Sequence, residues 1–203
     1  MLPIVLCVIV AASVFGVVVS ADADSGDVSL GSKNKTDDVT NLAEALNSIE
    51  GDYSLIWGLD AQAQEWLPYS PDVPSYVNRL SVLEIGKGYW MNMMEPGVLS
   101  YGDLSYELEK DWNLIGWGAS GGEMTPLTEG LASIDGIYTL VWTFDAVCQE
   151  WRVYDTAPGA PDDYVMLKSG QGYYLDVKYD CVLTYGINKY PLYSVWNLIG
   201  WLG

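Results

Sequence analysis

The residues that come nearest to a catalytic motif are Gly118-Ala119-Ser120-Gly121-Gly122. They match the Gly-x-Ser-x-Gly pattern, in which a nucleophilic serine sits on a turn between a strand and a helix. Such a serine needs a general base, usually a histidine. The sequence contains no histidine. We therefore interpret this segment as a flexible turn between two domains, and we expect no hydrolase activity from it.

Acidic residues offer two further kinds of chemistry. Glu65 and Glu150 have the type of side chain that acts as a glycosidase acid, but both stand beside a tryptophan in a predicted strand, which favours a structural or surface role. The absence of histidine removes most zinc and transition-metal sites. A calcium site near Asp60, near Asp145 or at Asp162-Asp163 remains as the metal candidate. Turn formation is the simpler role for these aspartates, so the sequence predicts no catalytic residue and no cofactor.

Aromatic side chains provide the one ligand hypothesis. The chain has nine tryptophans and fifteen tyrosines, and their flat rings can stack on sugar rings. The candidates for such a platform are Trp66, Trp90, Trp151, Tyr69 and Tyr154. Most of them lie at predicted strand positions, where burial in a β core is the usual role.

An internal repeat organises these candidates. Trp112-Asn113-Leu114-Ile115-Gly116-Trp117 returns unchanged at residues 196–201. Residues 40–66 align with 125–151 at an offset of 85, which becomes 84 after a one-residue slip in the middle loop. The repeat is too long for a solenoid and has the size of a small domain. We therefore predict two domains, at residues 40–118 and 119–203.

Each repeat is predicted to open with a short helix. Thr40 and Thr125 are the expected N-caps, because a hydroxyl can accept an unpaired backbone N–H. Pro126 is expected at the first helical position, where its missing N–H has no cost. Gly51 and Gly136 are expected to end the helices, since glycine tolerates the left-handed conformation.

Short strands follow in each repeat. Alternating apolar residues predict strands from Tyr53, from Trp66 to Tyr69, from Tyr89 to Met93 and from Val98 to Tyr101, with equivalents in the second copy. A proline-rich loop separates the second strand from the third. The fold class predicted is mostly β: two tandem small antiparallel β-sandwich or barrel-like domains, each with one short N-terminal helix.

Two cysteines distinguish the second copy. Cys148 aligns with Ala63, and Cys181 aligns with Gly97. Because both are confined to one copy, we expect them to lie close together, and in an exported chain they would form a disulfide. In the chain-entropy account, a loop of this length contributes about 3–4 kcal/mol to stability.

The first residues predict export. Leu2–Ser20 is apolar and uncharged, and small residues follow, which is typical of a signal peptide at 1–23 that is cut after Ala21 or Ala23. The basic residues that usually precede such a segment are missing, so retention as a membrane anchor is the alternative. Residues 24–39 read as a flexible linker, in which Asn34 begins a glycosylation sequon. The net charge of -18 argues against nucleic acid and anionic lipid as partners.

Several motifs are weak singly and specific as a set. They are Trp-Asn-Leu-Ile-Gly at 112–116, Leu-x-Ser-Ile-x-Gly-x-Tyr at 131–138, Trp-x-x-Asp-Ala at 142–146, Trp-x-x-Tyr at 151–154 and Gly-x-Gly-Tyr-Trp at 86–90. The set resembles a repeat of exported surface proteins of archaea and some bacteria, over nearly the whole chain after residue 40. The resemblance implies an accessory module of a cell envelope, without a catalytic residue. The chain departs from it because no Trp-Asn-Leu-Ile-Gly strand precedes the first unit.

Two functions from different classes follow. The first is a non-enzymatic extracellular structural protein of the surface-layer, sheath or fibre type, whose partners are copies of itself or other envelope proteins. The alternative is a carbohydrate- or matrix-binding module that uses surface tryptophan and tyrosine. For the last strand, at 196–201, we expect closure within its own chain rather than donation to a neighbouring chain.

Overall fold

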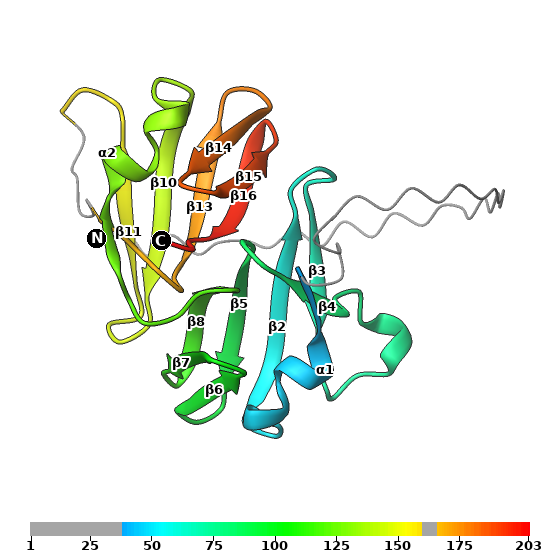
Figure 1. Cartoon of the computed structure of the whole chain (residues 1–203). Helices are drawn as coiled ribbons and strands as arrows, with labels where there is room; N and C mark the ends of the chain where they lie inside the picture. Colours follow the sequence, from blue (N-terminus) through cyan, green and yellow to red (C-terminus); the bar gives the residue numbers. More distant parts are fainter. Residues whose placement is uncertain (1–37, 160–165) are drawn as a thin grey trace, which may run out of the picture. The chain divides into compact units, whose positions relative to one another are not determined.

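The computed structural model describes residues 38–159 and 166–203. The described chain is mostly β, and its elements occur in two equivalent series (Figure 1). The first series is β1 (Val39–Asn41), α1 (Leu42–Ala45), β2 (Tyr53–Asp60), β3 (Glu65–Tyr69), β4 (Val82–Glu84), β5 (Gly88–Met93), β6 (Gly97–Tyr101), β7 (Leu104–Leu108) and β8 (Asp111–Gly116). The second series is β9 (Met124–Pro126), α2 (Leu127–Gly130), β10 (Tyr138–Asp145), β11 (Glu150–Asp155), β12 (Met166–Lys168), β13 (Gly172–Val177), β14 (Cys181–Tyr185), β15 (Asn188–Leu192) and β16 (Val195–Gly200).

Each series builds one four-stranded antiparallel sheet and two smaller pairs of strands. The large sheets have the orders β3-β2-β5-β8 and β11-β10-β13-β16. The hairpins β6-β7 and β14-β15, and the short pairs β1-β4 and β9-β12, complete the two series. The prediction of a mostly β, antiparallel fold is confirmed, and none of the described sheets closes into a barrel.

The strands form where the side chains alternate in burial. In β5, Tyr89, Met91 and Met93 are buried, while Trp90 and Asn92 between them are half-buried on the other face. Successive side chains of a strand point to opposite faces, so this pattern gives the first sheet one wholly buried face. The buried face packs on α1 and on the β6-β7 hairpin, in a core that includes Leu46, Leu99 and Trp117. The second sheet has an equivalent core that includes Leu131, Leu183 and Trp201.

The helices are shorter than the sequence predicts. Each is one four-residue turn of α-helix followed by a short 3-10 helix, Asn47–Ile49 in one repeat and Ala132–Ile134 in the other. The N-caps are Asn41 and Pro126, not the predicted threonines, and Pro126 precedes the first helical position. Asn41 Oδ1 accepts the backbone N–H groups of residues 43 and 44.

The two threonines have a different role. Trp117 Nε1 donates to Thr40 Oγ1 at 3.3 Å, and Trp201 Nε1 donates to Thr125 Oγ1 at 3.4 Å. Each bond ties the last residue of the repeated hexapeptide to the first strand of its own repeat. The hydroxyls thereby satisfy two indole N–H groups that are almost completely buried.

The last strand pairs within its own chain, as expected. β16 forms the edge of the second sheet through its pairing with β13, as β8 does through β5 in the first. The side chain of Trp201 is fully buried. Both repeats belong to one compact unit.

The predicted disulfide is wrong, because Cys148 and Cys181 are free. Cys148 lies in the turn after β10, beyond Asp145. Cys181 follows β13, whose Val177 pairs with Tyr138 at the other end of β10. The two thiols are therefore separated by the length of an eight-residue strand, about 20 Å. A disulfide needs Cα atoms within about 7 Å.

Several predictions lie outside the described residues. They are the signal peptide at 1–23, nearly all of the linker at 24–39, the sequon at Asn34 and the aspartates at 162 and 163. Among the described residues, no helix is both long and apolar enough to cross a membrane.

Candidate functional site: an aromatic layer between the repeats and a surface hollow

The second faces of the two large sheets carry most of the tryptophans. We call this set of side chains the aromatic layer. From the first repeat it includes Trp57, Leu59, Trp66, Trp90, Trp112 and Leu114, and from the second Trp142, Phe144, Trp151, Tyr174, Trp196 and Leu198. The members occupy equivalent positions in the two repeats.

Rings from the two repeats contact each other directly. Trp90 lies 5.1 Å from Phe144 and 5.4 Å from Trp151 between ring centroids, in edge-to-face geometry. Trp66 lies 6.1 Å from Tyr174. Such pairs add about 0.5–1.5 kcal/mol each beyond the area they bury. The layer is therefore a strong contact between the repeats.

One polar contact is set into this layer. Trp90 Nε1 donates a hydrogen bond of 2.6 Å to the hydroxyl oxygen of Tyr174, its equivalent in the other repeat. Burial raises the pKa of Tyr174, and the hydrogen bond from Trp90 acts against this shift. The hydroxyl is thus neutral at physiological pH and serves as a fixed acceptor.

The repeated hexapeptides meet at their glycines. A Cβ atom on Gly116 would lie 2.6 Å from Gly200 Cα, and a Cβ atom on Gly200 would lie 2.6 Å from Gly116 Cα. Gly116 N donates to Gly170 O at 2.8 Å, and Gly200 N donates to Gly86 O at 2.9 Å. Only glycine permits the two backbones to approach this closely. This contact explains why the same glycine stands in both copies.

The Gly-x-Gly segments that precede β5 and β13 have the same explanation. A Cβ atom on Gly88 would lie 2.8 Å from Leu198 Cγ, and one on Gly172 would lie 2.8 Å from Leu114 Cγ. The neighbours of these two glycines are thus residues of the opposite repeat.

Two glutamine side chains add hydrogen bonds to the contact between the repeats. Gln64 Nε2 donates to Trp196 O at 2.8 Å, and Gln149 Nε2 donates to Trp112 O at 2.9 Å. Both glutamines have a positive φ, of 55° and 54°, which directs them from the turn toward the other repeat. Gln171 also contacts the first repeat, because its Nε2 donates to Leu114 O at 2.9 Å. The first repeat has no glutamine at the equivalent position, so this hydrogen bond occurs once.

The structure divides the predicted sugar platform into two parts. Trp66, Trp90 and Trp151 lie together in the aromatic layer around Tyr174. Tyr69 and Tyr154 lie elsewhere and pack on the tyrosines that begin β2 and β10. Within the layer, the side chains of Trp66 and Trp151 keep 37% and 41% of their surface exposed, because they stand on the edge strands β3 and β11.

The candidate acidic residues have structural surroundings. Asp60 Oδ1 accepts the N–H groups of residues 62 and 63, and Asp145 Oδ1 accepts those of residues 147 and 148. The N–H of Cys148, together with Arg152, holds the pKa of Asp145 below its usual value. Glu65 and Glu150 are exposed and face arginines. Within 38–159 and 166–203, no three His, Cys, Asp or Glu side chains are grouped to hold a metal ion.

The serine motif lies in the connection between the repeats. Ser120 Oγ accepts the backbone N–H of Ser105 at 3.2 Å, so its hydroxyl helps to fix the turn at the end of the β6-β7 hairpin. The motif precedes a short strand, β9, rather than the helix that a nucleophile elbow requires.

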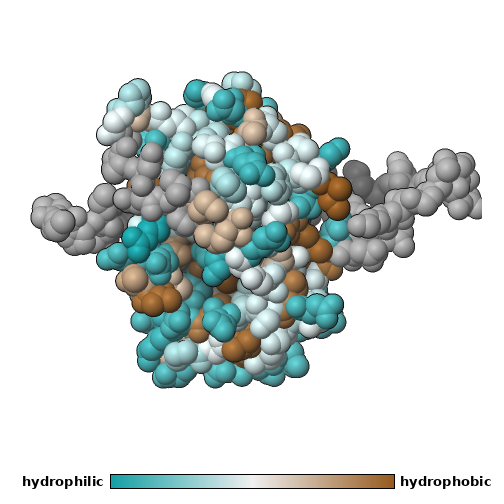
Figure 2. Space-filling view, turned by 60° about the vertical axis from the view of Figure 1, so that its left-hand side comes forward, coloured by the Kyte–Doolittle hydropathy of each residue, from teal (hydrophilic) through white to brown (hydrophobic). Residues whose placement is uncertain are grey.

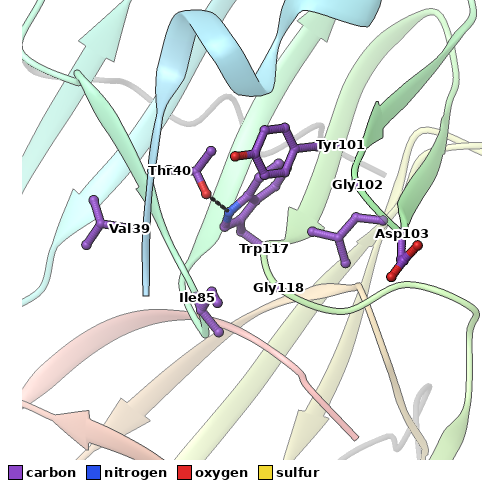
Figure 3. Close-up of a pocket in the computed structure, with 9 residues that line it drawn as sticks. Val39, Thr40, Ile85, Tyr101, Gly102, Asp103, Trp117 and Gly118 are labelled. Carbon is purple, nitrogen blue, oxygen red and sulfur yellow. Dashed lines mark hydrogen bonds between the residues drawn. The ribbon is translucent and has the colours of Figure 1, made fainter. Parts of the chain in front are cut away.

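An open hollow of about 500 Å³ lies beside β1 and the β6-β7 hairpin (Figure 3), and its lining is of mixed polar and apolar character. Its lining consists of Val39, Thr40, Ile85, Tyr101, Gly102, Asp103, Leu104, Trp117 and Gly118. Tyr101 and the buried Trp117 form its floor, with ring centroids 5.7 Å apart. Val39 and Ile85 stand at its edge with about two fifths of their surface exposed. Nothing in the sequence pattern indicated this hollow, since its lining comes from four separate segments.

The surface in Figure 2 has no continuous apolar region. On that face, hydrophobic residues are dispersed among hydrophilic ones. Dispersed apolar residues are normal on a protein surface.

No family model, curated protein or solved structure matches the chain.

Proposed function

We propose that this chain is a non-enzymatic structural protein of the cell exterior, of the surface-layer, sheath or fibre type, built from a duplicated β-domain. The observation that carries the proposal is the reciprocal contact at Gly116 and Gly200, flanked by Gln64 and Gln149. The residues that recur between the repeats are used to join them. A chain whose shared motifs serve its own assembly has the properties of a building unit.

The side chains suited to catalysis support the same proposal. The aspartates at 60 and 145 form turns, the glutamates at 65 and 150 face arginines at the surface, and Ser120 binds a backbone N–H. Export rests on the apolar leader, and the acidic surface suits a protein in contact with solvent ions.

The test is the behaviour of the secreted chain as its concentration rises. A structural unit is expected to form larger species in light scattering and regular arrays or filaments in electron microscopy. A chain that stays monomeric up to its solubility limit and binds one defined glycan tightly would contradict the proposal.

A carbohydrate-binding module is the second candidate, favoured by the partial exposure of Trp66 and Trp151 on both sides of Tyr174. If this reading is right, soluble polysaccharides will shift the tryptophan fluorescence, and Trp151→Ala will abolish the shift. Tyr76→Ala is the matched control, since Tyr76 is 87% exposed and has no place in the aromatic layer. Equal responses of the two variants would argue against the platform.

A further inference from the structure

Equivalent hairpins of the two repeats have opposite surface character. In the first repeat, residues 98–119 contain four acidic residues and one basic residue, namely Asp103, Glu107, Glu109, Asp111 and Lys110. In the second, residues 182–203 contain no acidic residue and carry Lys189. In a chain with 27 acidic and 9 basic residues, a run of 22 residues without an acid is a local exception. This hairpin therefore adds no negative charge of its own to the acidic surface, and the nearby carboxylates of Glu129 and Asp180 accept hydrogen bonds from Tyr185 and Ser194.

The tip of the second hairpin presents an apolar side chain to solvent. Ile187 stands between β14 and β15 and is 91% exposed, and its equivalent in the first hairpin is Asp103. An isoleucine at a turn tip stabilises nothing within the fold. Its exposure is the kind of feature that marks a contact with another molecule.

The hollow of the first repeat offers a complementary surface. Its lining combines aliphatic and aromatic side chains with polar groups, and Asp103 supplies a negative charge at its rim (Figure 3). The backbone of Asp38 and the side chain of Glu84 lie next to it, since Asp38 O accepts the N–H of Ile85 and Glu84 precedes that residue. The hollow suits an apolar side chain that has a cation nearby.

We propose that the β14-β15 hairpin of one copy docks in the hollow of a second copy, with Ile187 against the aliphatic and aromatic side chains of the hollow and Lys189 beside Asp103. This proposal rests on the proposed structural function and names its partner. The exposure of Ile187 shows that it does not fill the hollow of its own chain. Because the two surfaces differ, the contact is head-to-tail and leaves one free hairpin and one free hollow at the ends, so it extends into a chain of molecules.

Other exposed apolar residues fit the hollow less well. Val147 is 78% exposed, but Asp145 and Glu150 flank it, and they would approach Asp103. Tyr76 is 87% exposed in a segment that also carries Asp72. Only Ile187, among these three, has a lysine and no acid within four residues on either side.

The decisive experiment mixes two variants of the full secreted chain that are defective on opposite sides. Ile187→Asp replaces the exposed isoleucine by a charge, and Val39→Asp places a charge of the same sign in the hollow, beside Glu84 across β1-β4, so that the two substituted surfaces repel each other. Each variant alone is expected to lose the higher species, with self-association weakened about 10- to 100-fold, which is the effect of burying one such side chain. A 1:1 mixture is expected to form a dimer and nothing larger, because only one productive contact remains.

A charge exchange tests the second part of the contact. Asp103→Lys and Lys189→Asp are each expected to weaken association, and the double variant is expected to restore it. Val147→Asp is the matched control and should associate like the unchanged chain. Circular dichroism and thermal unfolding confirm that each variant is folded.

Three results would overturn the proposal. If the unchanged chain assembles and Ile187→Asp behaves like Val147→Asp, this contact is wrong while the structural function stands. If the unchanged chain never assembles and binds a glycan, both proposals fail. If it assembles only after removal of the residues before Asp38, those residues occupy the hollow and a second copy is not its partner.

Discussion

Gly116 and Gly200 are equivalent residues with the same surroundings, whereas Asp103 and Ile187 are equivalent residues with opposite character. The first pair lies where the repeats contact each other, and the second pair lies at hairpin tips in solvent. A residue that packs between the two repeats is restricted by both of them, because a substitution in either repeat disturbs the other. A hairpin tip has no such restriction, so the two copies can diverge there and acquire different surfaces.

The largest effect is expected from a substitution where the two repeats approach each other most closely. Gly116→Ala would place a Cβ atom 2.6 Å from Gly200 Cα and should destabilise the chain by about 3 kcal/mol in urea unfolding. Gly97→Ala is the matched control, because its Cβ atom would meet no atom closer than 3.6 Å. Gly200→Ala should match Gly116→Ala, and the double variant should be less destabilised than the sum of the two. Strict additivity would contradict a shared contact.

A pH titration compares two equivalent tyrosines. Burial raises the pKa of Tyr106 and of Tyr190 to about 12, while backbone N–H donors to each hydroxyl act against this shift. The unfolded chain loses these protons near pH 10, so the folded state binds more protons between pH 10 and 12. Stability is therefore fully present below pH 10 and falls as the pH rises through 12, by about 2 kcal/mol for each tyrosine.

The Tyr106→Phe and Tyr190→Phe variants provide the check on this pH dependence. Each should flatten the alkaline loss of stability, by similar amounts, in chemical unfolding measured from pH 9 to 12. Each should also lower stability at neutral pH, since Tyr106 Oη donates to Gly116 O and accepts the N–H of Gly118. An unchanged alkaline slope in both variants would show that other groups cause the loss.

The two glutamines should differ in magnitude. Gln149 Nε2 donates to Trp112 O, and its Oε1 accepts the N–H of Trp112, while Gln64 makes one hydrogen bond to the other repeat. We expect Gln149→Ala to cost about 2 kcal/mol and Gln64→Ala about 1 kcal/mol in unfolding free energy. Equal losses would mean that the second hydrogen bond of Gln149 contributes nothing.

The cysteines should produce the smallest effect. Because Cys148 and Cys181 are free, a reducing agent should leave the melting temperature unchanged, and Cys148→Ala should change stability by less than about 0.5 kcal/mol. Thiol reagents should modify Cys148 first, since it is exposed, while burial and the neighbouring Asp180 raise the pKa of Cys181. Mass spectrometry of the labelled chain would show the order.

The spacing of apolar residues predicted the long strands, because burial of one face of a sheet determines which residues of a strand are apolar. The alternation in β5 reflects a sheet with one wholly buried face, and it is visible over six residues, whereas a register shift interrupts it in β2 and both faces are buried in most of β8. β7 shows the same alternation at Leu104, Tyr106 and Leu108, so its signal was present although no strand was predicted there. β1 and β4 are three residues long, too short for any period to appear.

The remaining differences come from contacts distant in sequence. Leu42, Leu46 and Ile49 have helical spacing, but only four residues are α-helical before a 3-10 turn takes over. Cys148 and Cys181 occur in one copy, yet a whole strand separates them. The glycines at 88, 116, 172 and 200 were visible in both repeats. Their recurrence signals a close approach, but it cannot identify the atom that approaches.

The meeting of Gly116 with Gly200 also has a consequence during synthesis. These residues are separated by 84 positions, and the second repeat is translated after the first. Until β10, β11 and β13 have been made, Trp90 of the first repeat lacks its partners Phe144, Trp151 and Tyr174. A nascent chain with uncovered aromatic rings is prone to aggregate. The interval between the completion of the first sheet and that of the second is thus the period in which these rings are exposed.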